Sequence, residues 1–136
     1  MNIYLDIDGV LLAHENRAAD YADEFLQFIL KYWPETTYWL TTHCWKGHNR
    51  TYDVLEPYLR KQTLKQLHLI KPTEWGELKT DAINFKRPFL WFDDDLFDEE
   101  KQILEHYRAL ECHRRIDLGH DQFQLLDEIV HLRSLV

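Results

Sequence analysis

Residues 1–12 read MNIYLDIDGVLL, an apolar run that leads into two aspartates, Asp6 and Asp8, followed by Gly9. In an extended chain, residues i and i+2 point to the same side and lie roughly 6.5–7 Å apart. We therefore expect both carboxylates on one face at a strand end, with Gly9 turning the backbone because glycine adopts positive φ without steric cost. Two ionised carboxylates this close repel each other unless a proton or a cation compensates them. The pair suggests a hard metal such as Mg²⁺, against the alternative of a strand end with solvated aspartates.

Length and composition are typical of one globular domain covering residues 1–136, with 45% hydrophobic and 29% charged residues. The net charge of −8 argues weakly against broad electrostatic binding to nucleic acid, although acids held in a metal site would count for less. The N-terminal apolar run is interrupted by aspartates and has no basic segment before it, so we expect neither a signal peptide nor a membrane span. A cytoplasmic protein without a membrane partner is the expectation.

Hydrophobic periodicity predicts strands that alternate with helices. The expected strands are residues 2–6, 37–41, 67–70, 89–92 and 112–116. The expected helices are residues 20–33, a segment after Gly47 running through Leu59, one or two turns at 79–85, residues 95–110, and a last helix from 121 to 136. Such alternation predicts an α/β fold with a parallel sheet of about five strands and helices on both faces. Ligands of these sheets bind beyond the carboxyl ends of the strands.

Polar residues end three of the expected strands at that edge of the sheet. Asp6 ends the first, Thr41 the second, and the run 93–95 of three aspartates ends the fourth. One polar strand end means little by itself, but three at the ligand-binding edge, two of them carboxylate clusters, indicate a single site.

A cation completes this set. Lys79 opens a predicted helix, where the helix dipole disfavours a lysine, so a structural purpose for it is less obvious. Lys71, just after the third expected strand, is the competing candidate, and Thr42 competes with Thr41 for the role at the second strand end. Asp95 is expected to cap the helix at 95–110.

The order of DIDGV at 6–10, Thr41, Lys79 and FLWFDDD at 89–95 resembles the four signature motifs of the haloacid dehalogenase (HAD) superfamily of phosphohydrolases. The resemblance covers residues 3–95. It implies a three-layer, Rossmann-like fold and a Mg²⁺-dependent phosphatase, that is, a phosphomonoester hydrolase of the EC 3.1.3 class.

The resemblance also implies catalytic roles. Asp6 would attack phosphorus and form an aspartyl-phosphate, and Asp8 would protonate the leaving oxygen and then activate water. Thr41 would bond a phosphoryl oxygen, and Lys79 would stabilise the charge that develops on it.

The implied metal ligands are four aspartates. Asp6 and Asp93 would bind Mg²⁺ through their carboxylates, Asp8 through its backbone carbonyl, and Asp94 directly or through water.

Spacing between the motifs leaves no room for a cap domain, because only one helix and one strand fit in each interval. An open site favours a bulky phosphorylated substrate such as a nucleic-acid end or a phosphoprotein, and does not exclude a nucleotide. Candidate substrate residues are those after the second strand, namely Thr42, His43, Trp45, Lys46 and Arg50. Trp45 could stack on a base while the two cations meet phosphates, against the alternative that Trp45 packs on the domain.

The TTH sequence at 41–43 with a later asparagine, together with WFDDD at 91–95, is also similar to compact HAD domains associated with bacterial RNA repair. This similarity would imply removal of a terminal phosphate from RNA. Two other functions stay open from the sequence: a phosphotransferase, and a regulatory module that keeps the metal site without useful turnover.

Overall fold

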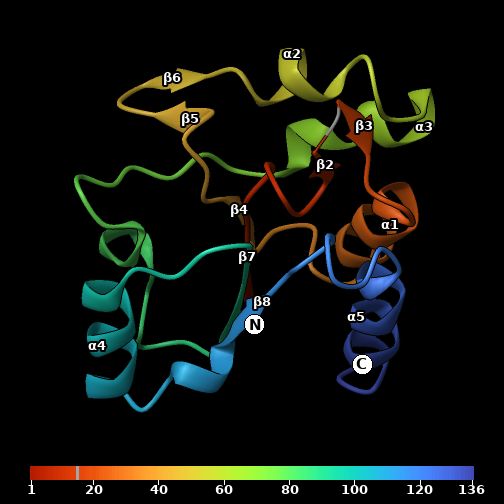
Figure 1. The fold of residues 1–136 in the computed structure, drawn as a ribbon. Coiled ribbons are helices and arrows are strands. Elements are labelled where there is room, and N and C mark those ends of the chain that lie inside the picture. The colour runs from red at the N-terminus through yellow and green to blue at the C-terminus, as the bar shows by residue number, and fades with distance from the viewer. Residues whose placement is uncertain (15) are drawn as a thin grey trace.

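A parallel sheet of four strands lies at the centre of the protein in the computed structural model, which describes residues 1–14 and 16–136 (Figure 1). The strands are β1 (Asn2–Leu5), β4 (Thr37–Trp39), β7 (Phe89–Asp93) and β8 (His113–Arg115), in the order β4-β1-β7-β8. Leu5 of β1 lies opposite Trp39 of β4 on one side and Phe92 of β7 on the other. The carboxyl ends of these strands therefore meet at one edge of the sheet.

Three longer helices pack around the sheet. The helices are α1 (Ala22–Tyr32), α4 (Asp98–His106) and α5 (Gln124–Arg133). Ile3 and Leu5 belong to the same buried cluster as residues of α1 and α5, whereas Tyr4 and Trp91 belong to a second cluster that includes Leu104 of α4. Figure 1 shows α1 and α5 next to each other on one side of the sheet and α4 on the other. The apolar, non-alternating sequences of β1 and β7 fit this two-sided burial.

Two small hairpins and several short helices complete the chain. They are β2 (Leu12–Ala13) with β3 (Arg17–Ala18), β5 (Cys44–Trp45) with β6 (His48–Asn49), α2 (Thr51–Leu55), α3 (Lys61–Leu64), and the 3₁₀ helices η1 (Leu67–Leu69), η2 (Lys79–Ala82) and η3 (Leu110–Cys112). The first hairpin comes after β1 and the second after β4, so both lie beyond the carboxyl edge of the sheet.

The strand expected at residues 67–70 is wrong. Leu67 and Ile70 are both buried, but Leu67 opens the 3₁₀ helix η1 and Ile70 directly follows its last residue. An apolar run this short does not distinguish a strand from a helical turn. The chain joins the sheet only afterwards, through a single parallel bridge between Tyr38 and Lys71.

The other expected elements are present with shifted ends. The helix predicted through Leu59 stops at Leu55, before Pro57, because proline cannot donate the next helical hydrogen bond. The helix predicted to begin at Asp95 begins at Asp98 with Phe97 as its N-cap, so the expected cap is wrong. Asp95 instead accepts a hydrogen bond from the backbone N–H of Leu96 at 2.8 Å.

Candidate active site

Three aspartates converge at the carboxyl edge of the sheet. Asp6 comes directly after β1 and Asp93 ends β7, and the Asp6 N–H donates to the carbonyl of Phe92 at 3.0 Å, so the two carboxylates are neighbours. Carboxylate oxygens of Asp6, Asp93 and Asp94 all lie within 4.8 Å of one another. Asp6 is 7% exposed and Asp93 2% exposed. The strand pairing thus brings together carboxylates that are far apart in the sequence.

Lys79 places its ammonium between two of these carboxylates. Its Nζ lies 3.1 Å from Asp6 Oδ2 and 2.7 Å from Asp93 Oδ2. Burial by itself would lower the pKa of this lysine, but the charges of Asp6 and Asp93 outweigh burial and raise the pKa above its ordinary value. The competing residue, Lys71, lies elsewhere, with its Nζ bonded to the Glu35 carbonyl at 2.7 Å. The structure therefore brings Lys79 into the site and leaves Lys71 outside it.

The cluster has an excess of negative charge. Among the described residues, Lys79 is the one cation within ion-pair distance of Asp6 or Asp93. Burial and, secondly, the charge of Asp6 raise the pKa of Asp93 to about 8, although Lys79 opposes this shift. A carboxylate that resists ionisation beside two others is a site that a divalent cation would stabilise. An all-oxygen donor set from Asp6, Asp93 and Asp94 is what Mg²⁺ prefers.

Gly9 makes room for Asp94. A Cβ placed on Gly9 would lie 2.3 Å from Asp94 Oδ2 and 2.5 Å from its Cγ, and the φ of Gly9 is +78°. A side chain at position 9 would therefore be strained and would also push the Asp94 carboxylate away. The glycine of the DIDG sequence is needed for the position of the third carboxylate as well as for the turn.

The Asp8 carboxylate stands apart from this cluster. Its side chain is 64% exposed, and its Oδ2 lies 2.8 Å from Nε2 of His43. Asp8 and His43, two of the predicted site residues, are therefore in contact with each other. The exposed position leaves the Asp8 carboxylate accessible to a bound molecule.

The two threonines after β4 differ in exposure. Thr41 is fully buried, and its hydroxyl oxygen accepts the His43 N–H at 3.3 Å. Thr42 lines a cleft of about 190 Å³ together with Asp6 and Lys79. Thr42 is thus the threonine whose surface faces the cleft, while Thr41 supports the turn that carries His43.

The remaining predicted substrate residues belong to the β5–β6 hairpin or come just after it. The indole N–H of Trp45 donates to the carbonyl of Trp75 at 2.9 Å, and the two rings are 5.8 Å apart. The Lys46 ammonium lies 4.3 Å from the Trp45 ring centroid. Trp45 is therefore held against the domain, while Arg50 is exposed at the start of α2.

Glu100 is a site residue that sequence reasoning missed. Its carboxylate is 3% exposed and accepts the backbone N–H of Lys79 at 2.9 Å and that of Phe97 at 3.1 Å. Glu100 thus fixes the start of η2, and with it Lys79, against the first turn of α4. In the sequence it looks like any acid that favours a helix N-terminus, and only its place three residues after the N-cap could have singled it out.

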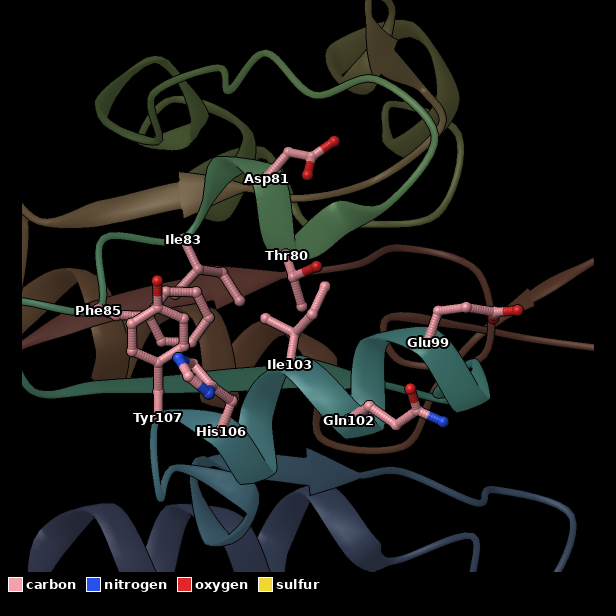
Figure 2. Close-up of a pocket in the computed structure, with 9 residues that line it drawn as sticks. All are labelled: Thr80, Asp81, Ile83, Phe85, Glu99, Gln102, Ile103, His106 and Tyr107. Atoms are coloured by element: carbon pink, nitrogen blue, oxygen red, sulfur yellow. The ribbon is translucent and has the colours of Figure 1, made fainter.

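A larger cavity lies away from the carboxylates. Its volume is about 680 Å³. Figure 2 shows Thr80 of η2 and Ile103 of α4 among the side chains that line it. Its aromatic wall is the stacked pair of Phe85 and Tyr107, with ring centroids 4.0 Å apart. None of the three clustered aspartates lines it. We therefore assign the chemistry to the smaller cleft, whose lining contains the acidic cluster.

Comparison with known proteins gives no relative from which a function could be transferred. No protein-family model matches the chain, and neither a curated protein nor a solved structure is significantly similar to it. In the part of the chain that the structure describes, no helix is long and apolar enough to cross a membrane. The site itself is therefore the basis for assigning a function.

Gly9→Ala is expected to weaken Mg²⁺ binding at least about tenfold, because the new methyl group overlaps the Asp94 carboxylate. Gly47→Ala is the matched control, since Gly47 also has a positive φ, of +82°, but has no atom within 4 Å of the added Cβ. Isothermal titration with MgCl₂ measures both. Equal affinities in the two variants would contradict the role of Gly9 in placing Asp94.

Metal-free protein is expected to lose stability as the pH rises from about 4 to 8. In the folded state the pKa of Asp93 is about 8, so this carboxyl group keeps its proton over most of the interval. In the unfolded chain the same group loses its proton near the ordinary pKa of 3.8. The folded state thus binds more protons in this interval, and its free energy of unfolding falls with pH. Asp93→Asn should remove this part of the slope and stabilise the metal-free protein at pH 8 by about 1–3 kcal/mol.

Urea unfolding in EDTA at pH 5.5 and pH 8 tests this expectation. An Asp93→Asn variant with the same pH slope as the parent protein would contradict it. Adding MgCl₂ should stabilise the parent more at pH 8 than at pH 5.5, since the metal competes with the proton.

Glu100→Gln is expected to lower the free energy of unfolding by about 1–3 kcal/mol. The amide oxygen of glutamine can accept a hydrogen bond from only one of the two backbone N–H groups, those of Lys79 and Phe97, and the amide N–H₂ group would face the other. Glu99→Gln, at the exposed neighbouring position, should change stability by less than about 0.5 kcal/mol. Urea unfolding of the two variants at pH 7 compares them. Similar losses of stability in the two variants would show that Glu100 stabilises the protein through general helix electrostatics and not through its contact with Lys79.

Proposed function

We propose that the protein is a Mg²⁺-dependent phosphomonoester hydrolase of the HAD type that acts through an aspartyl-phosphate on Asp6. The observation that carries the proposal is the convergence of Lys79 with Asp6, Asp93 and Asp94 at one sheet edge. Phosphoryl transfer needs positioning and neutralisation of spread negative charge more than any covalent help from the protein. A buried ammonium beside a carboxylate cluster supplies both.

A three-layer, Rossmann-like fold is part of the same proposal. Counting the bridge at Lys71 as the remnant of a fifth strand, the sheet would extend to five positions in a three-layer, Rossmann-like arrangement. The hairpins β2–β3 and β5–β6, with strands of two residues each, occupy the places where a cap domain would be inserted. We propose that the site is uncapped and open to large substrates.

In the first half of the reaction, Asp6 attacks phosphorus and the bond between phosphorus and the ester oxygen breaks. The exposed carboxyl group of Asp8 donates its proton to the departing oxygen. Lys79 stabilises the negative charge on the transferring group, and Thr42 or Thr41 supplies a hydroxyl for one of its oxygens.

In the second half, Asp8 takes a proton from water, and that water attacks the phosphorus of the aspartyl-phosphate. The acyl phosphate bond breaks, inorganic phosphate leaves and the Asp6 carboxylate is restored. Asp6, Asp93 and Asp94 would hold Mg²⁺, with the backbone carbonyl of Asp8 as a further ligand. When bound, the metal supplies charge neutralisation and orientation for the phosphoryl group.

Two alternative functions depart from the phosphatase in the fate of the phosphoryl group. A phosphotransferase would pass the phosphoryl group from Asp6 to an alcohol instead of water, and a regulatory module would bind metal and phosphate without turnover. The presence of Asp8, an exposed carboxyl group two residues after Asp6, favours the phosphatase, because both proton transfers need such a group.

Removal of a terminal phosphate from RNA is a narrower version of the proposal. The exposed Lys46 and Arg50 near the β5–β6 hairpin support it, since they could meet phosphates of a strand. Base stacking on Trp45 has less support, because its indole N–H is bonded to the Trp75 carbonyl and Lys46 lies over its ring.

Release of 4-nitrophenol from 4-nitrophenyl phosphate tests the activity. The parent protein should turn over with MgCl₂ and stop in EDTA, and Asp6→Asn should lower kcat at least about a thousandfold because it removes the nucleophile. Asp53→Asn, an exposed aspartate on α2, is the control and should keep the parent rate.

The phosphorylated state separates the alternatives. Acid-quenched protein should carry one phosphoryl group on Asp6 by mass spectrometry, and an Asp8→Asn variant should accumulate it. Phosphate release in water that is unaffected by added glycerol supports the hydrolase, whereas glycerol phosphate as the main product indicates the transferase. Absence of metal-dependent turnover, or an unchanged rate in Asp6→Asn, would refute the proposal.

A further inference from the structure

The cleft beside the carboxylates has two aromatic side chains in its lining, Trp75 and Phe97. Its volume of about 190 Å³ is well below the roughly 300–1,000 Å³ of sites for drug-sized ligands. Asp6 and Lys79 line the same cleft, so a group held beside Phe97 would lie next to a phosphoryl group at the carboxylates. The Phe97 side of the cleft is therefore placed to hold a small leaving group.

The fold does not explain why the side chain of Phe97 is exposed. It is the N-cap of α4 and lies two residues after the acidic run 93–95, yet its side chain is 53% exposed. Phenylalanine has no oxygen with which to cap a helix, so helix formation does not explain it. It belongs to neither of the two buried clusters of the core. Its ring is instead available to a molecule in the cleft.

Trp75 forms another part of the cleft wall. Trp45 fixes this segment by donating to the Trp75 carbonyl at 2.9 Å, so the hairpin supports Trp75. The indole nitrogen of Trp75 is shielded from solvent, so a molecule in the cleft meets the side chain without reaching its N–H.

Charge around the cleft limits what can enter. Glu77 and Asp95 also line it, and neither is in an ion pair among the described residues. The charge of Lys79 is already shared by Asp6 and Asp93. A leaving group with negative charge of its own would meet repulsion here, while an uncharged ring would not.

We infer that the Phe97 side of this cleft binds the leaving group of the substrate and that this group is a planar, uncharged ring stacked on Phe97. The inference rests on the proposed function for the phosphoryl end of the substrate. Aryl phosphates fit this description directly, and nucleoside monophosphates fit it with the sugar between the ring and the phosphoryl group.

Binding of phosphonates, which cannot be hydrolysed, tests the cleft separately from turnover. In isothermal titration with MgCl₂ present, phenylphosphonate should bind at least about tenfold more tightly than methylphosphonate, because only the former fills the aromatic cleft. Phe97→Ala should reduce that ratio below about threefold. Phe123→Ala is the matched control, since Phe123 is likewise an exposed helix N-cap, on α5, and it should leave the ratio unchanged.

Charge selectivity has its own variant. A carboxylate added at the para position of phenylphosphonate should weaken binding about fivefold or more, and Glu77→Gln should reduce this penalty.

The outcomes separate the inference from the proposed function. A missing preference for phenylphosphonate, or a preference that survives in Phe97→Ala, overturns the inference whether or not the protein is a phosphatase. A preference that depends on Phe97 in a protein without turnover supports the cleft and refutes the phosphatase. If the protein shows both the Phe97-dependent preference and turnover, kcat/KM is measured for phosphotyrosine and for 3′- and 5′-nucleoside monophosphates. The substrate whose kcat/KM falls most in Phe97→Ala identifies the class of leaving group.

Discussion

Compensation of negative charge at the carboxyl edge of the sheet is the constraint on which the rest of the site depends. Asp6 and Asp93 are buried side by side. The Lys79 ammonium, 3.1 Å from Asp6 and 2.7 Å from Asp93, reduces the repulsion between the two carboxylates. One ammonium does not neutralise three carboxylates. The pKa of Asp93 is raised, first by burial and then by the charge of Asp6, which shows that the negative charge is not fully compensated. Buried charge without full compensation costs stability, and proteins keep it where it serves function.

Several parts of the fold maintain this arrangement. The pairing of β1 with β7 sets Asp6 next to Asp93, and the absence of a side chain at Gly9 lets Asp94 approach from the loop after β7. Glu100 holds the backbone of Lys79 to the first turn of α4, which itself comes after the acidic run. The positions of the carboxylates and of the ammonium are thereby coupled through one strand pair and one helix end. Such support by rigid elements is what precise phosphoryl transfer would require.

The hairpins beyond the sheet edge give the site its surroundings. The β5–β6 hairpin brings Trp45 against Trp75, and Trp75 in turn lines the cleft beside the carboxylates. The aromatic residue that sequence reasoning selected thus supports another aromatic residue that it did not consider. Sequence proximity to the second strand end suggested Trp45, but 30 residues separate it from the partner that gives it a role.

Local sequence determined the features of this protein that depend on neighbouring residues. Apolar runs that end in carboxylates identified the ends of β1 and β7, because side-chain alternation and burial act within a strand. The DIDG sequence identified the turn at Gly9. Tertiary structure alone decided between Lys79 and Lys71, gave Glu100 its two backbone partners, and reduced the strand expected at 67–70 to a 3₁₀ helix and one bridge. The physical reason is that each of these outcomes depends on which distant segment a residue meets, and electrostatic contact, buried hydrogen bonding and edge pairing have no signature in the local pattern of a chain.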